Sequence, residues 1–205
     1  MCFSELREKE FATRLSGVPY LEILRSGGGI LSSVRSVRSA CDETILGRTL
    51  KNIHISLSHG TTTVEIKSGY GLDTASEIRL LRLIERVGRQ TPVTVVPTFM
   101  GAHAVPSEFT DDPEGYVDLL VKEMIPAVSA ECTPPFCDVF CEESVFSVPQ
   151  TRRILDTARE HGMKLKVHAD EVTDTGGAAL AAEMGAVSAE HLLAAREENL
   201  AKMAS

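Results

Sequence analysis

The stretch Leu165-Lys166-Val167-His168-Ala169-Asp170-Glu171 predicts a buried strand that ends in polar side chains. A histidine at the last position of such a strand, with a glutamate three residues later, would place an imidazole and a carboxylate at one mouth of a sheet. Metal-assisted hydrolysis uses this pair, because a neutral imidazole holds the cation while a carboxylate that is not a ligand moves the protons of water. The stretch therefore indicates both a strand and a candidate metal site.

On either side of this stretch, apolar runs rich in β-branched residues alternate with helical patterns. We expect strands at 61–66, 93–99, 136–140, 165–168 and 186–191. We expect helices after Asp73, from Asp112-Pro113 to Met124, from Ser147 to Gly162, from Gly177 to Met184 and, with a polar sequence, near residue 200. Five consecutive βα units predict an α/β fold with a parallel sheet, either a (β/α) barrel or an open sheet.

The N-terminal part has a different pattern. We expect helices at 5–15 and 20–26, then a break at Gly27-Gly28-Gly29 and a long helix from Leu31 onward. The triple glycine is a helix-breaking turn in this interpretation, since no strand precedes it and no lysine followed by serine or threonine closes a phosphate loop. We expect one domain over 1–205, with a helical lead-in at 1–59 and βα units at 60–205.

Composition narrows the class of partner. The chain has 205 residues, 43% of them hydrophobic, which is enough for a sizeable core. Its formal net charge is −8 and its lysines and arginines are scattered, so no basic stripe is available for nucleic acid or an anionic membrane. No apolar run reaches the roughly 18 residues that a spanning helix needs, and five irregularly spaced cysteines fit a reducing compartment. We expect a cytoplasmic protein that acts on a small molecule, with assembly into a homo-oligomer left open.

Polar side chains gather at the ends of the predicted strands, and in parallel sheets and barrels the site lies at those carboxyl ends. The polar strand ends include Tyr70, His103, Glu142-Glu143, the segment from His168 to Glu171, and Glu190-His191. A single strand-end histidine is more often a hydrogen-bonded structural residue than a ligand. Three histidines at equivalent positions favour a site.

Two other features have structural alternatives. Tyr70 lies between two glycines, so its ring either packs on a helix as part of a turn or donates its hydroxyl to a substrate anion. Cys137 and Cys141 are four residues apart on one predicted strand, about 13 Å at the usual rise, which is too far for both to bind one tetrahedral zinc ion. A cysteine zinc site is therefore excluded.

The polar strand ends lie in longer strings that resemble the imidazolonepropionase family of the amidohydrolase superfamily. These strings occupy 62–71, 97–106, 137–142, 168–171 and 188–192, and the segments 7–11 and 27–31 resemble the part of the family that follows its first barrel strand. The resemblance extends over nearly the whole chain. It implies a metal-dependent TIM-like (β/α)8 barrel that hydrolyses 4-imidazolone-5-propanoate to N-formimidoyl-L-glutamate in histidine degradation.

The resemblance also implies roles for particular residues. His168 would bind one zinc or iron ion, Glu171 would be the acid/base that also touches the substrate ring, and His191 would lie beside the metal-bound water. Arg7, Tyr70 and His103 resemble substrate-binding residues. Their guanidinium, phenol and imidazole groups can together hold a propionate carboxylate and polarise a ring carbonyl.

The chain departs from the family pattern in two places. Family members carry a His-x-His pair on the first barrel strand and a metal-binding aspartate on the last, and neither region is found in this sequence. We therefore expect an internal fragment of a longer enzyme, inactive by itself. Two alternatives stay open: a cytosine-deaminase-like amidohydrolase, which the strings at Tyr70 and His103 argue against, and a partial barrel without turnover.

Overall fold

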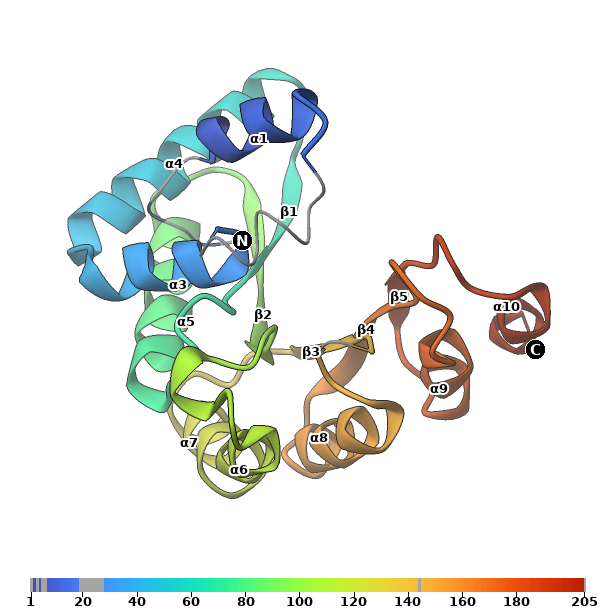
Figure 1. The fold of residues 1–205 in the computed structure, drawn as a ribbon. Helices are drawn as coiled ribbons and strands as arrows, with labels where there is room; N and C mark the ends of the chain where they lie inside the picture. The colour runs from blue at the N-terminus through green and yellow to red at the C-terminus, as the bar shows by residue number, and fades with distance from the viewer. Residues whose placement is uncertain (1, 3, 5–6, 19–27, 144, 205) are drawn as a thin grey trace.

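Five strands form one parallel sheet in chain order. They are β1 (Thr63–Lys67), β2 (Thr94–Ala102), β3 (Phe136–Cys141), β4 (Lys164–Ala169) and β5 (Ser188–His191). This computed structural model describes residues 2, 4, 7–18, 28–143 and 145–204. The sheet curls into a half-barrel with helices on its convex side (Figure 1). The predicted partial TIM-like α/β fold is confirmed.

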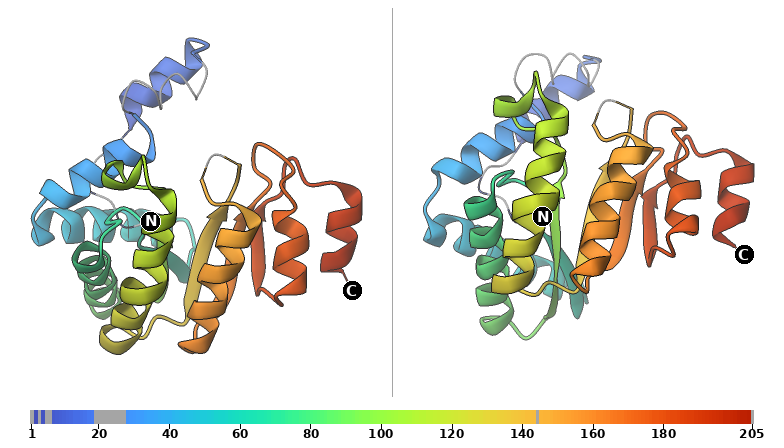
Figure 2. Two further views of the ribbon diagram at one scale, coloured as in Figure 1. Left: turned by 60° about the horizontal axis from the view of Figure 1, so that its bottom comes forward. Right: turned by 90° about the horizontal axis from the view of Figure 1, so that it is seen from below.

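The helices that connect the strands begin at the predicted caps. The side chains of Asp73, Asp112 and Ser147 accept hydrogen bonds from backbone N–H groups in the first turns of the helices that follow them. The helices are α5 (Thr74–Arg89), α6 (Pro113–Leu119), α7 (Ile125–Glu131), α8 (Val148–Glu160), α9 (Gly177–Glu183) and α10 (Glu197–Met203). They lie side by side along the outer face of the sheet (Figure 2).

The helix expected to end at Met124 continues further. A π-helical turn, η2 (Leu120–Met124), joins α6 to α7, and the helical segment reaches Glu131. Pro126 has no N–H to donate, and the wider turn before it takes up the resulting change in hydrogen-bond spacing. A short 3-10 helix, η1 (Ser107–Phe109), precedes this segment.

The lead-in contains α1 (Glu8–Leu15), α3 (Ile30–Ser39) and α4 (Asp42–Ser58). The single long helix expected from Leu31 is wrong, because Ala40 and Cys41 are extended and divide it. The Arg79 guanidinium from α5 donates to the carbonyl of Ala40 and pairs with Asp42, so it binds both sides of the break. The helix expected at 20–26 lies outside the described residues.

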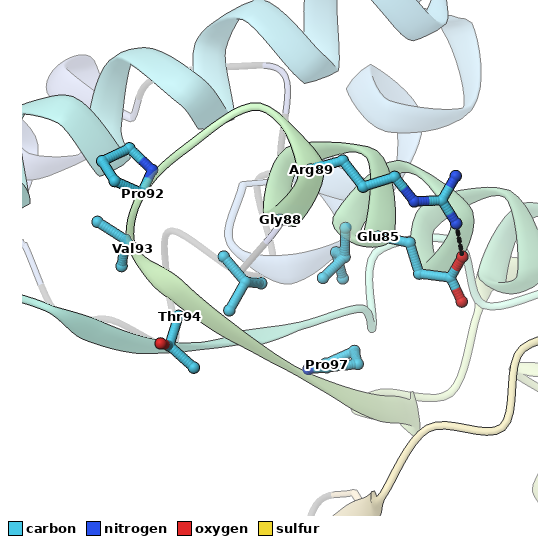
Figure 3. A pocket seen from close by; sticks show the side chains of 9 residues that line it. Glu85, Gly88, Arg89, Pro92, Val93, Thr94 and Pro97 are labelled. Atoms are coloured by element: carbon cyan, nitrogen blue, oxygen red, sulfur yellow. Dashed lines mark hydrogen bonds and ion pairs between the residues drawn. The ribbon is translucent and has the colours of Figure 1, made fainter.

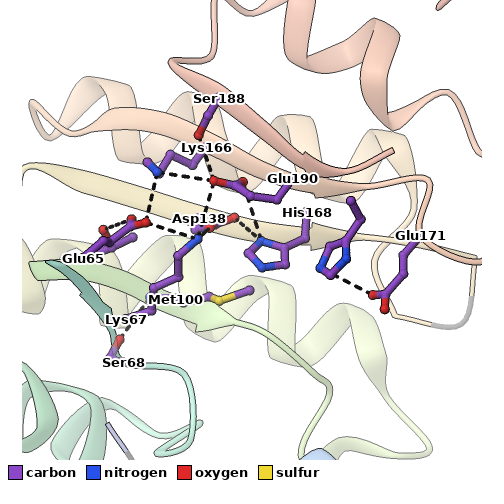
Figure 4. A network of polar contacts seen from close by, with 12 residues as sticks. Glu65, Lys67, Ser68, Met100, Asp138, Lys166, His168, Glu171, Ser188 and Glu190 are labelled. Carbon is purple, nitrogen blue, oxygen red and sulfur yellow. Dashed lines mark hydrogen bonds and ion pairs between the residues drawn. The ribbon is translucent and has the colours of Figure 1, made fainter. Parts of the chain in front are cut away.

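Side chains alternate between the two faces of the sheet, as the pleat requires. Outward-facing residues such as Ile66, Val139 and Val167 are buried beneath the helices and form the core. The inward face is charged, with Glu65 and Lys166 among its residues (Figure 4). The core therefore lies between the sheet and the helices, and the concave face carries polar and charged side chains. No helix in the described part of the chain is long and apolar enough to cross a membrane.

Candidate active site

A series of five rings crosses the carboxyl ends of the strands. Adjacent ring centroids are 5.2 Å apart for Tyr70 and His103, 6.4 Å for His103 and Phe140, 6.1 Å for Phe140 and His168, and 5.1 Å for His168 and His191. Each ring comes from a different strand or from the turn after it. The parallel register aligns these ends, for example Phe140 opposite His168. Four residues that the sequence singled out separately are thus brought together.

Glu171 joins this series at its β5 end. Its Oε2 atom lies 3.6 Å from His191 Nε2, and both side chains are about one-third exposed. The backbone here is in the left-handed region, with φ of 50° at Asp170 and 71° at His191. Such conformations are uncommon for residues other than glycine and cluster at functional sites. The geometry leaves Glu171 and His191 accessible at the mouth of the half-barrel.

His168 is oriented by an aspartate that the sequence analysis did not single out. His168 Nδ1 lies 2.9 Å from an oxygen of Asp138, whose side chain is fully buried and also pairs with Lys67 (Figure 4). Burial alone would raise the pKa of the Asp138 carboxyl, but His168 and Lys67 outweigh it and hold the pKa below its usual value. The carboxylate is therefore ionised and accepts the Nδ1–H. In the neutral imidazole that a metal would require, this donation from Nδ1 leaves the lone pair on Nε2.

Further charges fill the concave face around Asp138. Lys166 Nζ lies 3.1 Å from Glu65 and 3.3 Å from Glu190, and Lys67 approaches the same two carboxylates at 3.7 Å. Burial would lower the pKa of Lys166, yet the two glutamates outweigh it and raise the pKa. The ammonium groups of the two lysines thus pair with three carboxylates, and charge-assisted contacts hold the network together.

Asp138, His168 and Glu190 offer ligand atoms within 4.8 Å of one another, which raises the question of a cation among them. Glu190 Oε2 has no hydrogen-bond partner among the described residues and lies 3.9 Å from His168 Nδ1. However, Lys67 already pairs with both carboxylates and Lys166 with Glu190, and a metal there would have to displace the Nδ1–H bond. The donor set fits a metal better at His168 Nε2, with Asp138 as the carboxylate behind the ligand.

His103 is held in one tautomer. Its Nδ1 lies 2.9 Å from the carbonyl oxygen of Gly69, and since a carbonyl only accepts, Nδ1 carries the proton. Burial lowers the pKa of His103 to about 4, so the imidazole is neutral at pH 7. Its Nε2 is then an acceptor. This arrangement suits a substrate N–H rather than a carboxylate or carbonyl oxygen, which narrows the predicted role of His103.

Arg7 occupies a different position. It immediately precedes α1, and its guanidinium pairs with Glu10 at 2.8 Å. The other carboxylate oxygen of Glu10 accepts the N–H of Gly29, the residue that caps α3. The described contacts thus tie Arg7 to the lead-in helices, whereas those of the other predicted site residues join them to one another. Its substrate role stays a prediction.

A cavity elsewhere in the molecule has no link to these residues. It lies between α5 and the start of β2, lined by residues that include Glu85, Arg89 and Thr94 (Figure 3). This is the amino end of the strand, opposite the edge where parallel barrels place their sites. The ring series is therefore the better candidate site.

The fold and the site together define the class: a (β/α)-barrel protein with a histidine-lined mouth and a buried carboxylate behind one histidine. The sequence comparisons name the particular relatives. The chain is 59% identical over 204 residues to an imidazolonepropionase of Syntrophobacter fumaroxidans, 54% over 198 to one of Alkaliphilus oremlandii, and 49% over 204 to one of Shouchella clausii. These alignments cover 97–100% of this chain and 46–48% of the relatives.

The predicted resemblance to imidazolonepropionases is thus confirmed along the whole chain, which spans about half the length of the curated relatives it matches. No family model matches the chain.

Proposed function

We propose that this chain supplies part of the active site of a metal-dependent hydrolase that opens the ring of 4-imidazolone-5-propanoate and gives N-formimidoyl-L-glutamate. The proposal rests on the ring series at the strand ends. This series brings together the imidazole of His168, which suits a metal, the accessible carboxylate of Glu171, and the imidazole of His103, which accepts a hydrogen bond at Nε2. The name shared by the relatives, at 49–59% identity, supports the same reaction.

In this proposal His168 holds a zinc or iron ion through Nε2, while Asp138 fixes the ring by accepting the Nδ1–H. The metal, when bound, supplies a Lewis acid that polarises the attacked carbonyl and the water. Further ligands come from outside this chain, since family members take them from a His-x-His pair and a late aspartate. The Asp138–Lys67 pair keeps the carboxylate ionised throughout.

Glu171 moves the protons. It accepts one proton from the attacking water as the new C–O bond forms, and returns a proton to the ring nitrogen as the C–N bond breaks. His191, 3.6 Å away, orients the Glu171 carboxylate and the water. A carboxylate at the mouth can do this because both side chains reach solvent and substrate.

The remaining residues recognise the substrate. His103 Nε2 accepts a ring N–H, while the Tyr70 hydroxyl and the Arg7 guanidinium bind the propionate. A small anionic substrate of this kind suits a cytoplasmic enzyme of histidine degradation. The cytosine-deaminase-like alternative is not favoured by the relatives, none of which among those named above is a deaminase.

A hybrid protein tests the proposal. The chain would replace the aligned 204 residues of the Syntrophobacter fumaroxidans relative, so that the rest of that enzyme provides the other half of the barrel. We expect hydrolysis of 4-imidazolone-5-propanoate, loss of metal and activity in the His168→Ala variant, and retention of both in His54→Ala, whose exposed imidazole lies on α4. A folded, metal-loaded hybrid that leaves this substrate intact, or prefers cytosine, would disprove the proposal.

A further inference from the structure

The turn that carries Tyr70 wraps around a buried carboxylate. Glu77, on α5, is fully buried, and its oxygens accept the backbone N–H groups of Gly69 at 3.0 Å, Gly71 at 2.7 Å and Leu72 at 3.0 Å. The hydroxyl of Ser68 also bonds to it. Burial raises the pKa of the Glu77 carboxyl, and these four hydrogen bonds oppose that effect. A single side chain thus satisfies most donors of the turn.

The turn is closely packed against its neighbours. Gly69 has φ of 92° and Leu72 has φ of 53°. A Cβ atom at Gly69 would lie 2.8 Å from the carbonyl oxygen of Met100, and one at Gly71 would lie 2.8 Å from the backbone nitrogen of Glu77. Only glycine fits at both positions. The hydrogen bonds from its N–H groups to Glu77 hold the backbone in this conformation.

The same turn reaches both substrate-facing rings at the β1 and β2 ends. Tyr70 belongs to it, and the Gly69 carbonyl accepts the Nδ1–H of His103. The carbonyl and N–H of one residue, Gly69, thus connect His103 to Glu77. A shift of the turn would move the Tyr70 ring and break the hydrogen bond that fixes the tautomer of His103.

We propose that Glu77 is a positioning residue for substrate recognition, which fixes the Tyr70 ring and the His103 tautomer without touching the substrate. The role rests on the proposed function, in which these two rings bind the substrate. A carboxylate is needed because Gln at this position would present an NH2 group to N–H donors and leave some of them unpaired. Asp would keep the carboxyl group but shorten the reach.

Asp170 offers a matched control. Its carboxylate is also fully buried and accepts the backbone N–H groups of Thr175, Gly177 and Ala178, in the loop after β4. An amide substitution at either position therefore replaces a buried carboxyl group that accepts a similar set of backbone N–H groups. Of these two carboxyl groups, it is Glu77 that bonds to the Tyr70 turn.

Amide hydrogen exchange of the 205-residue chain tests the anchoring. In Glu77→Gln we expect the amides of Gly69, Gly71 and Leu72 to exchange at least tenfold faster, because some of these buried donors lose their acceptor. In Asp170→Asn their rates should change only as much as those of the sheet. Equal acceleration in both variants would overturn the role. If Glu77→Gln does not fold, Glu77→Asp replaces it, with the same comparison.

Kinetics in the hybrid test the consequence for recognition. Glu77→Gln should raise KM for 4-imidazolone-5-propanoate about tenfold or more and change kcat less, with partial recovery in Glu77→Asp. If the amides of the turn exchange faster in Glu77→Gln but KM is unchanged, the positioning role is wrong, while the hydrolase proposal stands. A hybrid without activity would instead count against the proposed function, and the exchange data alone would then decide whether Glu77 anchors the turn.

Discussion

Glu171 and His191 meet at the open end of the ring series, and the roles proposed for them differ in a measurable way. If Glu171 moves protons and is not a ligand, Glu171→Gln in the hybrid should leave the metal content nearly unchanged, because the amide keeps the shape of the side chain. Turnover should fall by roughly 10²–10⁴-fold, because the amide cannot accept a proton. Elemental analysis and initial rates on the same preparation measure both quantities.

Glu143 provides the matched control for this substitution. It is an exposed glutamate just after β3, at the same edge of the sheet. Glu143→Gln should keep both metal and turnover. Loss of metal together with activity in Glu171→Gln would make Glu171 a ligand and reject the proton-transfer role.

His103 gives the folded chain a dependence on acid. Its pKa is about 4 in the folded state and near 6.5 when unfolded, so between these values the unfolded chain binds the proton and the folded chain does not. Stability that is fully present above pH 6.5 should therefore be lost as the pH falls towards 4, by at most roughly 3 kcal/mol from this group. Urea unfolding at pH 7.5 and pH 5 measures the loss.

The His103→Asn variant isolates this contribution, since its amide can still donate to the Gly69 carbonyl but does not titrate. We expect a smaller loss of stability on acidification than in the parent chain. An identical loss in both proteins would assign the acid dependence to other groups.

At the scale of elements, the loops at the strand ends share one device. Three buried carboxyl groups accept backbone N–H groups from these loops: Glu77 of α5 from the turn after β1, and both Glu142 and Asp170 from the loop after β4. Backbone donors that would otherwise be buried without partners are satisfied in this way. Precise loops can thus be built without regular secondary structure.

Close packing of α9 on β4 leads to a prediction about two glycines. A Cβ atom at Gly177 would lie 2.8 Å from the Cβ of Ala169, whereas one at Gly47, in an exposed part of α4, would have no heavy atom within 4 Å. Gly177→Ala should therefore destabilise the chain by about 1–3 kcal/mol. Gly47→Ala should stabilise it by about 0.5–1 kcal/mol through helix propensity. Chemical denaturation compares them, and stabilisation by Gly177→Ala would contradict the packing described.

The extent to which elements could be predicted follows the range of the interactions. The strand expected at 136–140 is Phe136–Cys141, because alternation within a strand is a local signal. The division of the lead-in helix depends on Arg79, which is 39 residues from Ala40 in the sequence. The candidate site residues follow the same rule. His168 was evident at the end of an apolar strand, but Glu77 resembles an ordinary glutamate on an amphipathic helix until the turn around it is seen.

Asp138 is an intermediate case. A charged residue within the apolar strand Phe136–Cys141 is itself a signal, since charges inside a strand are rarely buried without a partner. Its pairing with His168, 30 residues away, required the sheet register.

At the scale of the whole molecule, the number of metal ligands gives the last prediction. Among the described residues the ring series offers His168, with His191 as a second imidazole, and catalytic zinc sites usually have three protein ligands. The isolated 205-residue chain, purified with ample metal, should contain much less than one ion per chain and show no ring opening. The hybrid should recover both, as measured by elemental analysis and substrate assay.

Tight one-to-one metal binding with hydrolysis by the isolated chain would contradict this. It would require Glu142, Asp170 or another carboxylate to complete the site. Both of these carboxylates are committed to backbone N–H groups, so such a result would also require their loops to rearrange.

The concave face of the half-barrel is ionic, with Glu65, Lys67, Asp138, Lys166 and Glu190 in one network. An exposed hydrophobic lining would favour aggregation of the chain, whereas a lining of ion pairs is readily hydrated. Among the described residues β1 and β5 are the outer strands of the sheet, and the Cys2 N–H already donates to the Lys67 carbonyl at the β1 edge. What an open half-barrel has to shield is then the remaining backbone at these two outer edges. The tendency to join another half should accordingly reside in those two edges.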